Sequence, residues 1–62
     1  MGLDVRMLRN PRAVRAFQRR GHQVYVWTVD TDDDITRCLD LGVDVIITNR
    51  PAHVLDRIAA SG

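Results

Sequence analysis

Two stretches of the sequence decide the fold: QVYVWTVD at residues 23–30 and LGVDVIITNRP at residues 41–51. β-Branched and aromatic residues dominate both stretches, and glycine or polar residues bound them, which is typical of β-strands. The pattern predicts one strand over residues 23–29 and a second over residues 43–48. In the first strand the apolar side chains fall on both faces: Val24 and Val26 on one, Tyr25, Trp27 and Val29 on the other. A strand of this kind is expected to be buried on both sides.

Helices are predicted around these strands. Asn10-Pro11 caps and opens a first helix that runs to residue 20, where Gly21 can adopt the left-handed conformation that ends it. Asp30-Thr31 caps a second helix that ends at Gly42, and Asn49-Arg50-Pro51 turns into a third. Their expected apolar faces are Ala13, Val14 and Phe17, then Ile35, Cys38 and Leu39, then Val54, Leu55, Ile58 and Ala59.

The order helix–strand–helix–strand–helix predicts an α/β fold with two parallel strands, as a single unit over residues 1–62. Two parallel strands leave open edges on both sides. The energy balance is also marginal: burial contributes about 90 kcal/mol, and ordering the chain costs about 93 kcal/mol. Cys38 is the one cysteine, so neither a disulfide nor a zinc site can compensate. We therefore expect a partner: the remainder of a larger fold, or further copies of the chain.

Charge and composition exclude other classes. The formal net charge of +1 gives no electrostatic basis for binding nucleic acid or a membrane. No apolar run is long enough to span a bilayer, and no signal peptide is visible, which favours a cytoplasmic protein by default.

The two strand stretches resemble the C-terminal part of the glycerophosphodiester phosphodiesterase family. That family has a hydrophobic run into Trp-Thr-Val-Asn, then a helix, then Gly-Val-Asp-Gly-Ile-Ile-Thr-Asp-x-Pro. Here the first element is Trp27-Thr28-Val29-Asp30, and the second runs over residues 42–51. The resemblance covers residues 10–58, nearly the whole chain.

The resemblance implies a partial (β/α)₈ (TIM) barrel and, for the full-length family, metal-assisted hydrolysis of glycerophosphodiesters in lipid metabolism to glycerol 3-phosphate and an alcohol. The family's catalytic His-Arg-Gly and its metal-binding Glu and Asp residues precede the region that aligns here. The chain holds no Glu and no His-Arg-Gly. We therefore assign no catalytic residue, no metal ligand and no cofactor to this chain and expect it to be inactive alone, although the family implies a divalent metal.

Four substrate-binding positions are expected in a completed barrel: Trp27, Asp30, Asn49 and Arg50. By resemblance Trp27 lines the pocket; the alternative is a core residue. Arg50, beside a helix N-terminus, could hold a phosphate or could be a plain loop residue. Asp30 and Asn49 exchange the family's Asn and Asp, as a hydrogen-bonded pair or by coincidence.

The remaining polar groups favour structural roles. The aspartates at positions 32–34 complement a helix dipole better than they fit a calcium loop. Arg12, Arg15 and Arg19 form the solvated stripe of an amphipathic helix, and no aromatic residues interleave with them to stack on bases. His22 is expected at the end of the barrel away from the site, His53 has no acid partner in the sequence, and Cys38 is expected to be buried and inert.

Two functions stay open. The favoured one is a C-terminal segment of a phosphodiesterase-like barrel that contributes pocket wall. The other is a non-enzymatic module that self-associates as a regulatory or scaffolding homo-oligomer.

Overall fold

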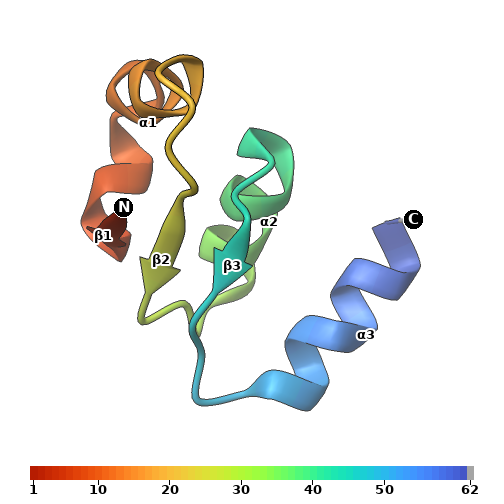
Figure 1. The fold of residues 1–62 in the computed structure, drawn as a ribbon. Coiled ribbons are helices and arrows are strands. Elements are labelled where there is room, and N and C mark those ends of the chain that lie inside the picture. Colours follow the sequence, from red (N-terminus) through yellow and green to blue (C-terminus); the bar gives the residue numbers. More distant parts are fainter. Residues whose placement is uncertain (62) are drawn as a thin grey trace.

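A computed structural model of the protein describes residues 1–61 and contains three strands, three α-helices and one 3₁₀-helix (Figure 1). Helices lie against one side of a small parallel sheet whose strand order is β1-β2-β3. The elements in chain order are β1 (Gly2–Asp4), the 3₁₀-helix η1 (Val5–Arg9), α1 (Pro11–Arg19), β2 (Tyr25–Trp27), α2 (Asp32–Leu41), β3 (Val45–Ile46) and α3 (Pro51–Ser61).

The sheet has three strands, so the expectation of two parallel strands is wrong. The segment Gly2–Asp4 pairs in parallel with β2, with Leu3 opposite Val26 and Asp4 opposite Trp27. Its sequence, Gly-Leu-Asp, has no β-branched residue, so it carries no strand pattern of its own. The neighbouring strand decides its conformation. The element order therefore begins with a strand and a 3₁₀-helix before the expected helix–strand alternation.

The two expected strands are present but their regular parts are shorter than the sequence pattern. Backbone hydrogen bonds continue beyond them: Asp44 N donates to Val24 O at 2.8 Å, and Val29 N donates to Ile47 O at 2.9 Å. The Asp44 carboxylate also accepts from Val24 N at 2.7 Å. The apolar pattern therefore indicates the length over which the two segments lie side by side. This length exceeds that of the regular β-ladder.

The helix ends lie where the sequence places them. Asn10 Oδ1 accepts from Ala13 N at 3.4 Å, and Thr31 Oγ1 accepts from Asp34 N at 3.2 Å. Gly21 and Gly42 have φ of 82° and 67°, the left-handed conformation that ends a helix without a Cβ penalty.

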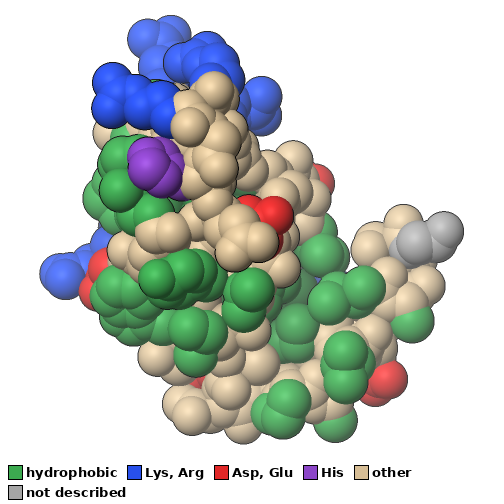
Figure 2. All heavy atoms as spheres, viewed as in Figure 1, with side chains coloured by type: hydrophobic (Ala, Val, Ile, Leu, Met, Phe, Trp, Pro, Cys, Tyr) green, Lys and Arg blue, Asp and Glu red, His purple; other side chains and the backbone are tan. Residues whose placement is uncertain are grey.

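The core lies between the sheet and the helices, on one face of the sheet only. Val24 and Val26 are fully buried there, together with Val14 of α1 and Ile35 of α2. Side chains on the opposite face are exposed by 40% to 49%: Tyr25, Trp27, Val45 and Ile47. Figure 2 shows hydrophobic side chains gathered on this side of the molecule. The expectation that β2 is buried on both faces is therefore wrong, because nothing within residues 1–61 covers the second face. Val29, expected on the same face as Tyr25 and Trp27, is fully buried, unlike those two residues.

The last helix is only loosely attached. Figure 1 shows α3 leaning away from the sheet. Of its expected apolar face only Val54 is buried, while Leu55 is 65% exposed and Ile58 is 42% exposed. A cleft of about 410 Å³ separates α3 from α2 and β3, and its lining includes Cys38, Ile46, Val54 and Ile58. The outer side of α3 thus lacks the packing partner that its sequence pattern predicts.

We expect Ile35→Ala to destabilise the chain by about 2–5 kcal/mol, because it removes a fully buried side chain and leaves a cavity. Leu55→Ala, the matched control on the exposed side of α3, should cost about 0.5 kcal/mol or less. Thermal unfolding followed by circular dichroism, with trimethylamine N-oxide added to stabilise the weaker variant, measures both. Equal losses would show that α2 is not packed as described.

Candidate functional site

The carboxyl ends of β2 and β3 are tied together by one carboxylate. Asp30 follows β2 and accepts hydrogen bonds from three groups that follow β3: Thr48 Oγ1 at 3.2 Å, Asn49 N at 3.0 Å and Asn49 Nδ2 at 3.3 Å. Two of the positions at which the chain departs from the family pattern, Asp30 and Asn49, therefore meet as a hydrogen-bonded pair. We call Asp30, Thr48, Asn49 and Arg50 the strand-end cluster.

Arg50 is drawn into the same cluster by its main chain and its side chain. Its amide donates to Thr48 Oγ1 at 2.9 Å, and its Nη1 donates to the carbonyl oxygen of Asp30 at 3.1 Å. Pro51 then begins α3, so Arg50 directly precedes a helix N-terminus. A guanidinium next to a positive helix end is a combination that can bind a phosphoryl oxygen.

The hydrogen bonds keep Asp30 ionised. The backbone N–H of Asn49, followed by the side chains of Asn49 and Thr48 and the charge of Arg50, lowers the pKa of Asp30 below its usual value. The carboxylate is therefore a fixed negative acceptor that orders the two loops. Its oxygens already receive three donors, which makes it a poor choice as a metal ligand.

Trp27 lies on the exposed face of the sheet, two residues after Tyr25 and on the same side of the strand. Both rings extend over Gly2 of β1, since a Cβ built on Gly2 would lie 2.7 Å from Trp27 Cζ3 and 2.7 Å from Tyr25 Cε2. The indole is 40% exposed and borders open space on this side of the chain. This face of a parallel sheet is the one that a closed barrel turns inward.

Comparison with known proteins gives the fold its context. The sequence model of the glycerophosphoryl diester phosphodiesterase family matches residues 2–53 of the chain. The chain belongs to this family. It is 44% identical over 52 residues to a probable glycerophosphodiester phosphodiesterase of Mycobacterium tuberculosis, which covers 84% of the chain and 20% of that protein.

Other relatives include plant and spider proteins. A glycerophosphodiester phosphodiesterase of Arabidopsis thaliana is 49% identical over 39 residues, or 63% of the chain and 12% of the relative. A dermonecrotic toxin of Loxosceles spinulosa is 43% identical over 37 residues, or 60% of the chain and 14% of the toxin. The chain thus spans a fifth or less of the length of these relatives. No solved structure matches. The α/β fold with parallel strands is consistent with a part of the family's barrel.

A second polar cluster, between α2 and α3, is absent from the sequence-based interpretation. His53 Nε2 lies 2.5 Å from Asp32 Oδ1, Arg57 Nη1 donates to the same oxygen at 3.1 Å, and Arg57 Nη2 donates to Thr36 Oγ1 at 2.6 Å. His53 therefore does have an acid partner, contrary to expectation. The hydrogen bond from His53, then its charge and the contacts of Arg57, lowers the pKa of Asp32.

The signal for this pair was present in the sequence. Asp32 and His53 each lie in the first turn of a helix that follows one of two neighbouring parallel strands, and such turns lie at the same edge of the sheet. The cluster joins two helices through hydrogen bonds between side chains of α2 and α3, so it is best explained as the attachment of α3. Within residues 1–61, no group of three or more His, Cys or acidic side chains is arranged to hold a metal ion.

Cys38 is the buried thiol that the sequence predicts. It is 1% exposed, and burial, with a smaller effect of Asp34, raises its pKa to about 11. Such a thiol stays protonated and unreactive near neutral pH. In the part of the chain that the structure covers, no helix is long and apolar enough to cross a membrane.

The strand-end cluster should make stability depend on acid pH. Because the pKa of Asp30 is lower in the folded chain, its contribution is full above the ordinary aspartate pKa of about 4 and is lost as pH falls through the lowered value. We expect Asp30→Asn to lower the melting temperature at neutral pH and to flatten the decline toward low pH.

Thermal melts between neutral pH and pH of about 2 test this expectation. Asp33→Asn is the matched control, because the Asp33 side chain accepts no hydrogen bond within residues 1–61. An unchanged acid decline in the Asp30 variant would show that its carboxylate does not hold the strand ends together.

Proposed function

We propose that this chain supplies part of the substrate-pocket wall of a phosphodiesterase-type barrel, and that the completed barrel hydrolyses glycerophosphodiesters to glycerol 3-phosphate and an alcohol. The observation that carries this proposal is the convergence of Asp30, Asn49 and Arg50 at the carboxyl ends of two adjacent parallel strands. Active sites of (β/α)₈ barrels lie at this end.

Each side chain has a distinct part in the proposal. The indole of Trp27 offers an apolar surface against which the glycerol or alcohol moiety packs. Arg50 faces the phosphodiester with the N-terminus of α3 behind it. Asp30 positions Arg50 and Asn49 through the contacts described above, and does not itself touch the reacting phosphorus.

The acid–base groups and the divalent metal that the family uses lie elsewhere in the completed barrel in this proposal. A divalent cation there would withdraw charge from the phosphodiester oxygens. The strand-end cluster does not fit that role, since its one carboxylate already accepts three hydrogen bonds from Thr48 and Asn49. The chain alone is therefore expected to release no glycerol 3-phosphate.

A chimera tests the proposal. Residues 2–53 would replace the matching segment of the Mycobacterium tuberculosis relative, and glycerol 3-phosphate release from glycerophosphocholine would be measured. We expect the chimera to be active and the chain alone to be inactive. In the chimera, Trp27→Ala should lower kcat/KM by about tenfold, the loss of one good packing contact.

Tyr25→Ala is the matched control, since Tyr25 is exposed to the same extent on the same face but lies farther from the strand ends. Its kcat/KM should change by less than about threefold. Similar losses in the two variants would show that Trp27 acts through packing of the sheet. Activity of the chain alone would refute the assignment of the catalytic groups to another part of the barrel.

The second candidate is a self-associating module, and the uncovered face of the sheet favours it. Tyr25, Trp27, Val45 and Ile47 form an apolar surface there, and β1 and β3 are both edge strands. Contact between two such faces, or pairing of two edges, would cover what the chain leaves open, and closed dimers are the commonest solution.

Light scattering over a dilution series distinguishes this candidate. We expect a mass of at least twice 7.0 kDa at concentrations where the chain is folded, with dissociation accompanied by loss of helicity. Val45→Asp, on the uncovered face, should shift the equilibrium toward monomer. A folded 7.0 kDa monomer at every concentration would rule the module out.

A further inference from the structure

The net charge of +1 conceals a separation of charge along the chain. Residues 1–22 contain six arginines and one aspartate, a formal charge of +5, whereas residues 23–62 contain three arginines and seven aspartates, a charge of −4. In Figure 2 the basic side chains gather at one end of the molecule. They come from η1 and α1, and we define the arginine stripe as Arg9, Arg12, Arg15 and Arg19, all exposed.

In the described part of the chain, no acidic side chain forms an ion pair with an arginine of the stripe. The ion pairs within residues 1–61 use Arg6, Arg37, His53 and Arg57. Beside the stripe, a cleft of about 460 Å³ opens between α1 and α2, and Arg9, Arg15 and Arg37 line it with Asp40 as its one carboxylate. Charge is thus concentrated on this surface without internal neutralisation.

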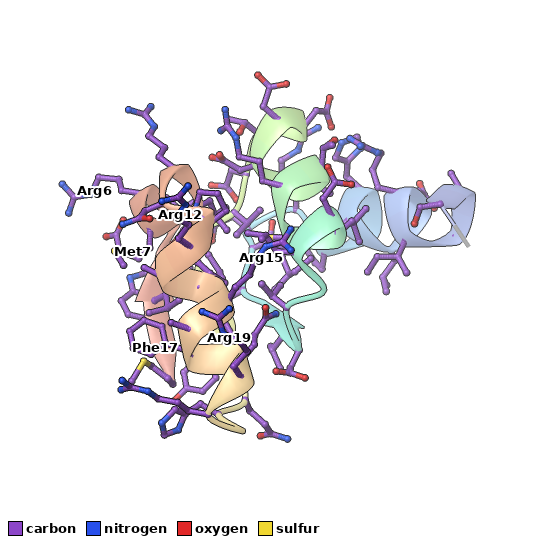
Figure 3. The ribbon with its side chains drawn as sticks, turned by 90° about the horizontal axis from the view of Figure 1, so that it is seen from above. Arg6, Met7, Arg12, Arg15, Phe17 and Arg19 are labelled. Carbon is purple, nitrogen blue, oxygen red and sulfur yellow. The ribbon has the colours of Figure 1, made fainter. Side chains whose placement is uncertain are left out.

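The arginine stripe also lies away from the uncovered face of the sheet, so a partner bound to that face would not cover the stripe. Figure 3 shows Arg12, Arg15 and Arg19 spaced along α1. α1 packs its Val14 against the core on the helix-covered side, opposite the uncovered face of Trp27 and Val45. A closed barrel or a face-to-face dimer would therefore leave the arginine stripe in contact with solvent.

We propose that the arginine stripe docks the protein on an anionic lipid surface. Guanidinium groups form strong bidentate contacts with phosphate groups, and several of them on one helix face match a flat, negatively charged surface. The apolar side of α1 is occupied: Val14 is fully buried and Phe17 packs against the core. Binding is therefore electrostatic, without insertion of the helix, and should be sensitive to salt.

Other anionic partners fit the surface less well. A second copy offers a less concentrated acidic surface: Asp32 and Asp34 are in ion pairs and Asp30 is held in the strand-end cluster. Of the exposed aspartates that remain, Asp33, Asp40 and Asp56 are divided between α2 and α3. Single-stranded nucleic acid is usually bound with aromatic side chains that stack on bases. The stripe has none, since the exposed Tyr25 and Trp27 lie on the opposite side of the sheet.

Co-sedimentation with vesicles tests the proposal. The probes are phosphatidylcholine vesicles with and without about 30% phosphatidylglycerol, in low salt and in about 1 M NaCl, where the screening length falls to about 3 Å. We expect binding only to the anionic vesicles and only in low salt. Arg12→Gln with Arg15→Gln should weaken it about 25-fold, from about fivefold for each arginine near the surface.

The matched control is Arg50→Gln with Arg57→Gln, which removes the same charge from two arginines that belong to neither η1 nor α1 and that donate hydrogen bonds to Asp30 O and to Asp32. It should weaken binding by less than about threefold. Arg12→Lys with Arg15→Lys should retain most of the binding, and circular dichroism confirms that each variant is folded. Equal weakening by the two Gln pairs, equal binding to neutral vesicles, or equally tight binding to a single-stranded oligonucleotide would overturn the proposal.

Discussion

The burial of Val24 and Val26 beneath the helices is the interaction on which the rest of the structure depends. Both valines belong to the central strand or its start, and both are fully buried. β2 pairs with a strand on each side, so its position sets the register of β1 and β3. Because alternate residues point to opposite faces, packing these valines inward turns Tyr25 and Trp27 outward. The outward-facing indole of Trp27 is thus a consequence of core packing one residue away.

Much of this arrangement could be predicted from the sequence, and the failures have physical causes. Helix ends were predictable because Asn10, Thr31, Gly21 and Gly42 act locally, through their own side chains or their own φ angles. β1 was not, because three residues without β propensity become a strand only when a neighbour pairs with them. Burial of both faces of β2 was wrong, since the apolar pattern of a strand predicts a second layer that residues 1–61 do not supply.

In the candidate site, too, local features could be predicted and features that depend on distant residues could not. That Asp30 and Asn49 lie near each other follows from parallel strand ends, and the sequence raised their pairing as one of two alternatives. The part played by Arg50, whose side chain reaches back to a carbonyl oxygen before the second helix, depends on loop geometry that no motif encodes. The pair of His53 and Asp32 needed the angle between α2 and α3 in addition to the strand order. The sequence therefore predicts which groups can form hydrogen bonds, whereas it does not predict the distances between groups on different loops.

The bare Cα of Gly2 has a consequence for observing this molecule. Two aromatic rings occupy the volume that a side chain at this position would take, and one of them is the single tryptophan of the chain. The surroundings of the indole therefore change whenever the first strand leaves the sheet, even if every helix stays formed. Intrinsic fluorescence thus follows the docking of the N-terminal strand, while the far-ultraviolet signal follows the helices. Trp27 is therefore an intrinsic fluorescent probe for β1, the strand that the sequence pattern did not predict.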